Sequence, residues 1–448
     1  MLSKDEARDK AQALIERAIR AGADAADGVY IADSAESVGV RLGRLEDVSR
    51  SESEHIGLRV FVGRRSASIG SSDLSDAALA ELAARAIDMA RAAPEDPYAG
   101  LAPEERLLKA PPVDLDLIDA EEPTPAQLRA LAEAAEEAAR AIAGVTNSEG
   151  AGASSSSAVM ALATSHGFAG AYAGTSRSVS ASVVAGEGSG MQRDYGWRAA
   201  RHGEDLPAPD AIGRIAGERA VARLNPGRLK SGPMPVVFDP RVGGSLVGHL
   251  VGAMSGAGIA RRASFLLGRE EEQLFDSAIR IIDDPLRARG LRSRPFDGEG
   301  LPTAPRDLVA GGRLTGWLME SASARQLGLA PTGHASRGGN GAPGVAPSNL
   351  HLAAGTASVA ALIADIEEGV LVTELIGHGV NGVTGDYSRG ASGLRIVRGE
   401  IAGPVAEFTI AGNLVDMFRA LSVADDLEWH RTINVPTIRI DGMMVAGD

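Results

Sequence analysis

The chain of 448 residues contains no cysteine, so it has no disulfide, no thiol nucleophile and no thiolate metal ligand. Aromatic residues make up only 4% of the sequence, whereas glycine is abundant, with 55 residues. No apolar run approaches the roughly 20 residues that a membrane-spanning helix needs. The charged segment 1–10 lacks the apolar core of a signal peptide, so we expect a cytoplasmic protein that does not associate with a membrane.

Basic residues are also fewer than acidic residues. The sequence has 45 Lys and Arg against 59 Asp and Glu, a formal net charge of −14 at pH 7. An acidic surface repels the phosphate backbone of nucleic acids. The densest basic segment, Arg261 and Arg262 with Arg269, is followed directly by three glutamates at 270–272. We therefore expect no nucleic-acid partner.

Three helices are predicted in the first part of the chain from their N-terminal signals. Ser3 and Glu6 form a capping-box pattern ahead of an apolar stripe that ends near Gly22. Ser75 is typical of the cap of a second helix, and Thr124 with Pro125 is typical of the start of a third, which runs to about residue 144.

Strands are predicted around these helices from the alternation of apolar and polar residues. Alternation is clear at 38–42 and again at 56–62. Segment 154–201 is rich in Ser, Gly and β-branched residues, and we expect several short antiparallel strands there. A further helix is expected at about 211–224.

A domain junction is predicted where Asn225-Pro226-Gly227 and, shortly after, Pro233-Met234-Pro235 interrupt the chain. We expect an α+β fold with an N-terminal α+β domain at 1–228 and a β-rich, mostly antiparallel and barrel-like domain at 229–448. The second domain opens with a strand at 236–238, which is followed by a helix at about 243–256.

That helix has one apolar face and one face of small residues. Gly248, Gly252 and Gly256 are costly in a helix, by up to about 1 kcal/mol each relative to alanine, so we expect another backbone to approach them closely. His249 lies off the apolar face. Taken alone, the pattern favours a packed helix that carries a hydrogen-bonded histidine.

The helix and several glycine-rich strings resemble the PmbA branch, also called TldE, of the TldD/PmbA peptidase-associated family. The likeness covers nearly the whole chain and includes the segments 38–72, 261–267, 329–335, 383–390 and 409–414.

The resemblance implies a metal site that this chain has lost. In the TldD branch the equivalent helix carries a His-Glu-x-x-x-His motif, whose histidines hold zinc and whose glutamate is the general base. Here the motif positions are Gly248, His249 and Ala253, and the family's additional cysteine ligand is missing. The resemblance therefore implies no catalytic residue, no metal and no cofactor in this chain, with zinc only in a TldD-like partner.

Other histidines and polar groups offer weaker patterns. His334, His351 and His378 have no partner at metal-ligand spacing. Glu374 and His378 would share a face of a helix, but the flanking residues favour a strand followed by a glycine turn. Segment 384–390 is predicted to be a flexible loop in which Asp386 and Arg389 pair. The candidate substrate-binding residues are His249, His378, Asp386 and Arg389.

Two functions are consistent with these observations. The first is a subunit without a metal in a TldD–TldE type metalloprotease complex that cleaves unfolded peptides, inactive alone and active as a heterodimer with a TldD-like chain. Extended peptides would add to an exposed strand edge. The alternative is a homodimeric peptide-binding or regulatory protein without proteolytic activity, which acts indirectly on DNA gyrase, as an old association of the family suggests.

Overall fold

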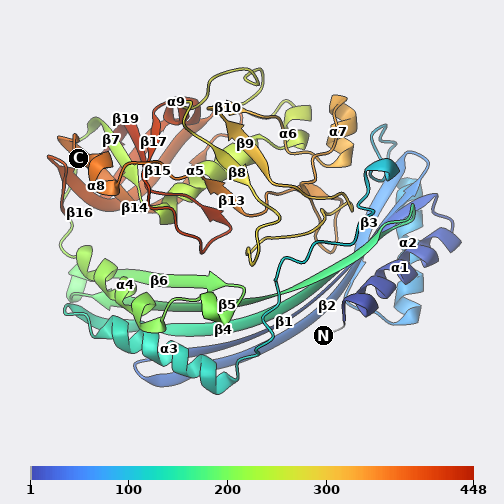
Figure 1. Cartoon of the computed structure of the whole chain (residues 1–448), viewed down its shortest axis with the longest axis horizontal. Coiled ribbons are helices and arrows are strands. Elements are labelled where there is room, and N and C mark those ends of the chain that lie inside the picture. The colour runs from blue at the N-terminus through green and yellow to red at the C-terminus, as the bar shows by residue number, and fades with distance from the viewer. Residues whose placement is uncertain (1–2, 448) are drawn as a thin grey trace.

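The computed structural model describes residues 3–447, and its N-terminal half is built on one long antiparallel sheet. The sheet has the strand order β3-β2-β1-β4-β5-β6 and curves beneath the C-terminal half (Figure 1). Its strands are β1 (Ala25–Arg41), β2 (Arg44–Val62), β3 (Arg65–Ser71), β4 (Val145–Thr164), β5 (Ala169–Ala185) and β6 (Gln192–Ala200).

The strands in the serine-rich segment are long rather than short, which corrects the prediction. β4 alone has 20 residues and pairs with β5 along almost its whole length. Serine does not interrupt these strands because its hydroxyl groups find partners across the sheet. The hydroxyls of Ser154 and Ser178, for example, lie 2.8 Å apart on paired positions.

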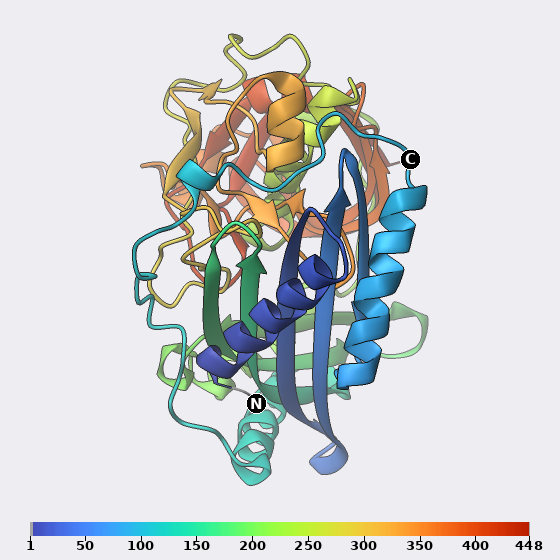
Figure 2. The same cartoon turned by 90° about the vertical axis from the view of Figure 1, so that its right-hand side faces the viewer.

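Within the described chain, four helices cover the outer face of the sheet, and three of them begin at the capping residues that the sequence predicted, Ser3, Ser75 and Thr124. They are α1 (Lys4–Arg20), α2 (Asp76–Ala92), α3 (Pro125–Arg140) and α4 (Pro209–Ala222). Helices α1 and α2 pack at one end of the sheet, and α3 and α4 pack at the other (Figure 1; Figure 2). The predicted capping boxes at Ser3 and Thr124 are both formed. Short 3-10 helices lie at Glu104–Arg106, Gly188–Gly190 and Gly203–Asp205.

The C-terminal half contains a small barrel. Five strands follow the order β16-β15-β14-β7-β19, and pairing of β16 with β19 closes the ring, while β17 adds to β19. Among the described strands of the barrel only the β14–β7 pair is parallel, and outside the barrel β13 and β18 also pair in parallel. The predicted α+β class with a mostly antiparallel, barrel-like second part is therefore confirmed. The strands are β7 (Gly232–Phe238), β14 (Glu368–Val380), β15 (Asp386–Val397), β16 (Glu400–Asn413), β17 (Leu421–Val423) and β19 (Ile438–Ala446).

A second sheet and five helices pack around this barrel. The sheet has the order β10-β9-β8-β13-β18, and a separate pair is formed by β11 and β12. These strands are β8 (Ile281–Asp283), β9 (Arg306–Ala310), β10 (Arg313–Leu314), β11 (Ala335–Ser336), β12 (Gly344–Val345), β13 (Leu350–Leu352) and β18 (Ile433–Asn434). The helices are α5 (Pro240–Ala253), α6 (Gly256–Ala260), α7 (Ser321–Leu327), α8 (Val359–Ile363) and α9 (Leu414–Arg419).

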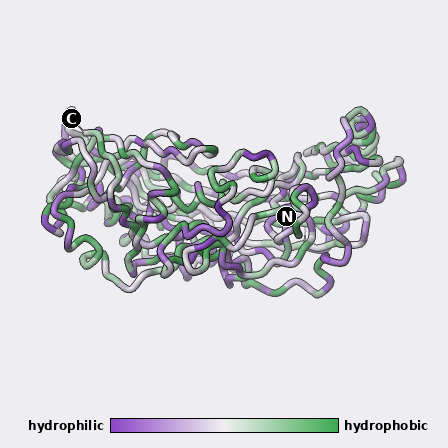
Figure 3. The backbone as a smooth tube through the Cα atoms, turned by 90° about the horizontal axis from the view of Figure 1, so that it is seen from above, coloured by the Kyte–Doolittle hydropathy of each residue, from purple (hydrophilic) through white to green (hydrophobic). Residues whose placement is uncertain are grey.

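The two halves meet along the inner face of the long sheet. Helix α4 ends at Ala222 and β7 begins at Gly232, so residues 223–231 connect them. From above the molecule is elongated, and hydrophilic and hydrophobic residues alternate along the trace (Figure 3). Within residues 3–447, no helix is both long enough and apolar enough to cross a membrane.

Candidate functional site

Helix α5 carries the three motif positions, and its start is fixed by the sequence that follows β7. The Asp239 side chain caps the helix by accepting a hydrogen bond from the backbone N–H of Arg241 at 2.9 Å, and Pro240 occupies the first turn. The helix therefore begins three residues before the predicted start and ends at Ala253, before Gly256. Its predicted apolar face, which includes Leu246 and Leu250, is buried.

The predicted close approach of another backbone to the small-residue face is wrong within α5. A Cβ atom added at Gly248 would lie 3.9 Å from a side-chain carbon of Ile433, and one added at Gly252 would meet nothing within 4 Å. Only Gly256 is tightly packed, and it belongs to α6, where an added Cβ would lie 2.6 Å from Met319. No close backbone contact therefore requires glycine at these two positions of α5.

His249 is half-buried and packs against an aromatic ring from the barrel. Its ring lies edge-on to that of Tyr387, with centroids 6.2 Å apart. Its Nε2 atom is buried and has no hydrogen-bond partner among the described residues, which departs from the expected bonded histidine. Burial lowers the pKa of His249, and the charges of Arg389 and His378 lower it further. The imidazole is therefore neutral near pH 7, and its buried Nε2 atom is unpaired among the described residues.

Strands β14 and β15 bring two of the other predicted residues to His249. His378 is exposed on β14 and Arg389 lies on β15, and both are close enough to affect the pKa of His249. Arg389 donates from Nε to the carbonyl of Ile376 at 3.3 Å, which holds the guanidinium on the hairpin. We call His249, His378, Tyr387 and Arg389 the α5 cluster.

Tyr387 is the member of this cluster that the sequence did not reveal. It is 2% exposed, and its hydroxyl has no hydrogen-bond partner in the described part of the chain. Burial raises its pKa to about 12, so the phenol stays protonated and can donate a hydrogen bond. The only available signal was the alternation of a strand, which places Tyr387 and Arg389 on one face.

Asp386 does not belong to the cluster, and the predicted flexible loop with an Asp386–Arg389 pair is wrong. Residues from Asp386 onward form β15, so Asp386 and Arg389 point to opposite faces of a strand. The Asp386 carboxylate instead accepts hydrogen bonds from Thr384 at 2.6 Å and from Asn413 at 3.2 Å, and these bonds hold its pKa below the usual range. Asp386 thus orders the turn before β15.

Strand β14 continues past the predicted glycine turn and leaves one edge free. Its pairing with β7 stops at Val372, whereas its pairing with β15 runs on to Val380 with irregularities around Gly377. Among the described strands, none pairs with the other edge of β14 between 373 and 380. Residues 376–379 on this segment are exposed, so a peptide backbone can reach them.

The residues around α5 do not fit a zinc ion. A catalytic zinc site uses about three protein ligands, and Gly248 and Ala253 have no donor atom to offer. His249 supplies one imidazole and the chain has no thiolate. Within residues 3–447, no group of three or more His, Cys, Asp or Glu side chains lies together as metal ligands would.

The start of α5 is tied to the N-terminal half by a buried ion pair. Arg241 donates to both carboxylate oxygens of Asp194 on β6, at 2.6 and 3.1 Å, and Arg223 reaches the same carboxylate at 3.4 Å. Burial raises the pKa of Asp194, but the hydrogen bonds and charge of Arg241 outweigh this and hold the pKa below its usual value. Arg223 also pairs with Glu374 on β14, so α5 and β14 are anchored by one network.

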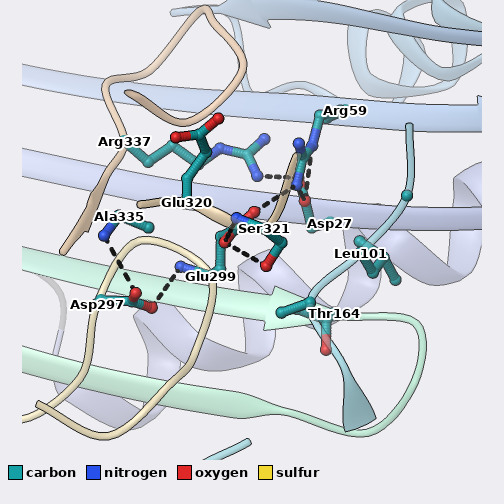
Figure 4. Close-up of polar contacts among 12 residues, drawn as sticks. Asp27, Arg59, Leu101, Thr164, Asp297, Glu299, Glu320, Ser321, Ala335 and Arg337 are labelled. Atoms are coloured by element: carbon teal, nitrogen blue, oxygen red, sulfur yellow. Dashed lines mark hydrogen bonds and ion pairs between the residues drawn. The ribbon is translucent and has the colours of Figure 1, made fainter. Parts of the chain in front are cut away.

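A second buried ionic cluster joins the two halves farther along the sheet (Figure 4). Asp27 on β1 accepts from Arg59 on β2, at 2.8 Å from Nε, and from Arg337 of the C-terminal half. Glu299 lies 3.8 Å from Arg59 and accepts hydrogen bonds from the backbone and hydroxyl of Ser321 at 2.8 and 2.7 Å. We call Asp27, Arg59, Glu299 and Arg337 the interdomain ion cluster.

The interdomain ion cluster is closed to solvent and therefore serves structure rather than catalysis. All four side chains are at most 7% exposed. Burial raises the pKa of Glu299 and lowers that of Arg59 to about 10, since removal from water disfavours both charged forms. This cluster was not predictable from the sequence, because Asp27 and Arg59 lie more than 200 residues before Glu299 and Arg337 along the chain.

Three family models match the chain and together span most of it. They are described as PmbA/TldA metallopeptidase domain 1, central domain and C-terminal domain, and they match residues 26–90, 118–224 and 231–447.

Two curated relatives match over nearly their full length. The chain is 37% identical to the metalloprotease PmbA of Escherichia coli O157:H7, over 100% of this chain and 98% of that protein. It is 36% identical to the PmbA homolog of Haemophilus influenzae, over 99% and 97%.

Solved structures are similar as well. A putative modulator of DNA gyrase from Bacteroides thetaiotaomicron superposes with a TM-score of 0.91 at 26% identity, with full coverage of both chains. TldE from Thermococcus kodakarensis superposes with a TM-score of 0.86, over 98% of this chain and 100% of that one, and at 22% identity shares the fold.

Proposed function

The chain belongs to the PmbA/TldD metallopeptidase family, and on that premise we propose that it is the subunit without a metal centre in a two-chain peptidase. In this proposal a TldD-like partner supplies the zinc and the hydrolytic chemistry. This chain binds unfolded peptide and presents it to the partner. The cleavage of peptides belongs to the complex, and the chain alone is inactive.

The single observation that carries the proposal is the content of the motif positions on α5. Where the family motif places two zinc ligands, this chain has Gly248 and Ala253, which have no donor atoms. Where the motif places the general base, it has His249, whose neutral imidazole has a free buried nitrogen. A polar atom that is buried and unpaired calls for a partner, and a peptide amide would satisfy it.

The free edge of β14 supports a role in peptide binding. An extended peptide that adds beside residues 373–380 would pair through its backbone, so recognition would depend little on its sequence. His378 lies on this segment of β14 and Arg389 lies on the neighbouring β15, and both are close enough to His249 to lower its pKa. The guanidinium of Arg389 would attract acidic side chains or a peptide carboxylate. Of the four sequence candidates, His249, His378 and Arg389 are retained in this proposal and Asp386 is not.

The β14–β15 hairpin also presents apolar groups to solvent. Ile376 and Val383 are 58% and 57% exposed on the segment that carries the α5 cluster. Exposed apolar side chains close to a polar site are typical of a surface that another protein covers. We place the partner contact here, so that the zinc of the TldD-like chain would face the bound peptide.

Two measurements test the proposal together. Metal analysis of the purified chain is expected to find no stoichiometric zinc, and the chain alone is expected to leave an unfolded peptide intact. Co-expressed with a TldD-like chain that carries His-Glu-x-x-x-His, it is expected to co-purify and to yield an activity that a chelator abolishes. Chelator-sensitive activity of the chain alone would refute the proposal.

The alternative of a homodimeric peptide-binding or regulatory protein is favoured by one comparison. The Bacteroides structure bears the description of a putative modulator of DNA gyrase. With a net charge of −14, direct DNA binding is disfavoured, so such an effect would be indirect. A stable homodimer that does not bind a TldD-like chain but does bind unfolded peptide would favour this alternative.

A further inference from the structure

A cavity of about 280 Å³ lies between the two halves and outside the α5 cluster. One wall is the end of β6, at Ala199 and Ala200, and the others are the C-terminal segments 287–291 and 429–434. The cavity lies close to α5. Asn434 lines the cavity, and the neighbouring Ile433 contacts α5 at Gly248. We call it the arginine cavity.

Arg287 is held in this cavity by an aromatic ring rather than by an acid. The centre of its guanidinium lies 3.4 Å from the centroid of the Trp429 ring. Its side chain makes no ion pair or hydrogen bond with another described residue, and the nearby Asp284 carboxylate accepts from the backbone of Leu286 instead. Stacking uses the flat face of a guanidinium and leaves its in-plane N–H groups free.

Arg431, which also lines the cavity, lies over a second tryptophan ring. Its guanidinium lies 5.5 Å from the centroid of the Trp197 ring, and its Nε atom is buried without a hydrogen-bond partner in residues 3–447. No carboxylate of the described chain forms an ion pair with it. Two arginines with unused donors therefore line one cavity, which is unusual in a protein with a net charge of −14.

The surroundings of the cavity are positive. His430, which lines the cavity and lies against the Trp197 ring, has a pKa lowered to about 3 by burial and by the charges of Arg198, Arg431 and Arg219. The acids nearby are occupied, since Asp205 pairs with Arg289 and Glu428 pairs with Arg198. Arg287 and Arg431 form no ion pair with these acids or with Asp284, whose charge acts on Arg287 from farther away, and the excess of positive charge would attract an anion.

The loop that carries Arg431 is rigidly held. The side-chain oxygen of Asn434 accepts from the backbone N–H groups of His430 and Arg431 at 3.2 and 3.0 Å. On the other side, the Asn349 amide is fully used by the chain: it donates to Ser293 and the Asp284 carbonyl and accepts from the Arg292 backbone. These hydrogen bonds thus fix the backbone around the two arginines before any ligand binds.

We propose that the arginine cavity binds a small oxyanion, a carboxylate or a phosphate group, through the in-plane N–H donors of Arg287 and Arg431. Arginine recognises both groups with paired hydrogen bonds. The volume admits a group the size of a peptide C-terminus or a small phosphorylated molecule, and these two sources share the same chemistry. The inference does not depend on peptidase activity or on a partner chain.

Tryptophan fluorescence offers a direct test, because Trp429 is 39% exposed and stacked on Arg287. The purified chain is titrated at constant ionic strength with inorganic phosphate, with trialanine and with trialanine amide. Saturable binding of phosphate or of the free-acid peptide is expected, and the amide is expected to bind at least about tenfold more weakly, since it lacks the charge that strengthens such hydrogen bonds. Phosphate alone or the peptide acid alone would identify the source.

Variants tie the signal to the cavity. Arg287→Gln and Arg431→Gln are each expected to weaken binding about tenfold, and Arg287→Lys, which keeps the charge but loses the planar fork, to weaken it less. Arg64→Gln, at an exposed arginine of the other half, is the matched control and is expected to bind like the wild type. Thermal unfolding of each variant verifies folding. No saturable binding of any probe, equal binding of acid and amide, or full binding in both glutamine variants would overturn the inference.

Discussion

His249 occupies one position of the metal motif that this chain lacks, and it is also the residue that we propose contacts the peptide. Its Nε2 atom is buried and unpaired within the described chain, and Tyr387 fixes the ring from the side. An unsatisfied buried polar group costs about 1–3 kcal/mol of free energy. A ligand that forms a hydrogen bond with Nε2 would remove this cost.

The replacement His249→Ala is therefore expected to weaken peptide binding by the two-chain complex. We expect KM for an unfolded peptide to rise about tenfold with kcat unchanged, since the hydrolytic chemistry resides in the partner. Steady-state kinetics of the co-purified complex measures both constants. Ser388→Ala, on the opposite face of β15 from Tyr387, is the control and is expected to change neither. An unaltered KM in the His249 variant would remove this residue from the site.

His430 links pH to stability with a definite sign. Its pKa is lowered to about 3 in the folded chain, whereas an unfolded histidine titrates near 6.5. Below pH 6.5 this histidine therefore binds a proton in the unfolded state but not in the folded state. The free energy of unfolding falls as the pH drops toward 3. Between pH 7 and pH 4 the expected loss from this group is on the order of 3 kcal/mol.

The replacement His430→Asn is expected to remove that component of the acid sensitivity. Urea unfolding at pH 7, 6, 5 and 4 gives the free energy of unfolding for the wild type and the variant, and the two curves are expected to converge as the pH falls. His378→Asn, which removes an exposed histidine, serves as the comparison. Parallel curves for the wild type and His430→Asn would contradict the assignment.

At the scale of helices and strands, the predictions that rested on local chemistry were confirmed. Capping residues such as Ser3 and Thr124 act within a few positions of themselves, so the sequence marks these helix starts. Strand lengths depend on partners far away, and the serine-rich β4 is long because β1 and β5 pair with both of its edges. Length of this kind cannot be read from local composition.

The candidate site was predictable only in part, for the same reason. The sequence and the family resemblance located His249, and the structure places His378 and Arg389 beside it. Tyr387 was missed because its approach to α5 is a tertiary contact. Asp386 was misplaced because a loop was expected where β15 begins, and a strand sends residues three apart to opposite faces.

The β14–β15 hairpin yields a prediction about assembly. Replacing Ile376 with Asp puts a charge into the proposed partner surface, where desolvating it would be costly, so co-purification with a TldD-like chain is expected to be lost. Val113→Asp, at a similarly exposed apolar residue of the N-terminal half, is expected to leave assembly intact. Pull-down and size-exclusion chromatography compare the two. Retained assembly in the Ile376 variant would move the interface elsewhere.

At the scale of the whole molecule, the two halves are held together by buried charge as well as by apolar packing. The interdomain ion cluster and the Asp194–Arg241 pair both cross the boundary, and both are almost fully enclosed. Such pairs often add little to stability compared with apolar substitutes, but breaking one strands its partner charge in the interior. They therefore fix how the halves are oriented, which in turn positions α5 and β14 next to each other.

Replacing Asp27 tests that view most directly. Among the described residues, it is the one whose carboxylate accepts hydrogen bonds from both Arg59 and Arg337. Asp27→Asn leaves the buried guanidinium of Arg337 without a counter-charge and leaves Arg59 with only the more distant Glu299, and we expect a loss of about 3–5 kcal/mol in the free energy of unfolding. Asp33→Asn, six residues along the same strand but exposed, is expected to change stability by less than about 0.5 kcal/mol. Calorimetry of the two variants and the wild type measures these losses. A loss as small as that of Asp33→Asn would mean that apolar packing alone aligns the halves.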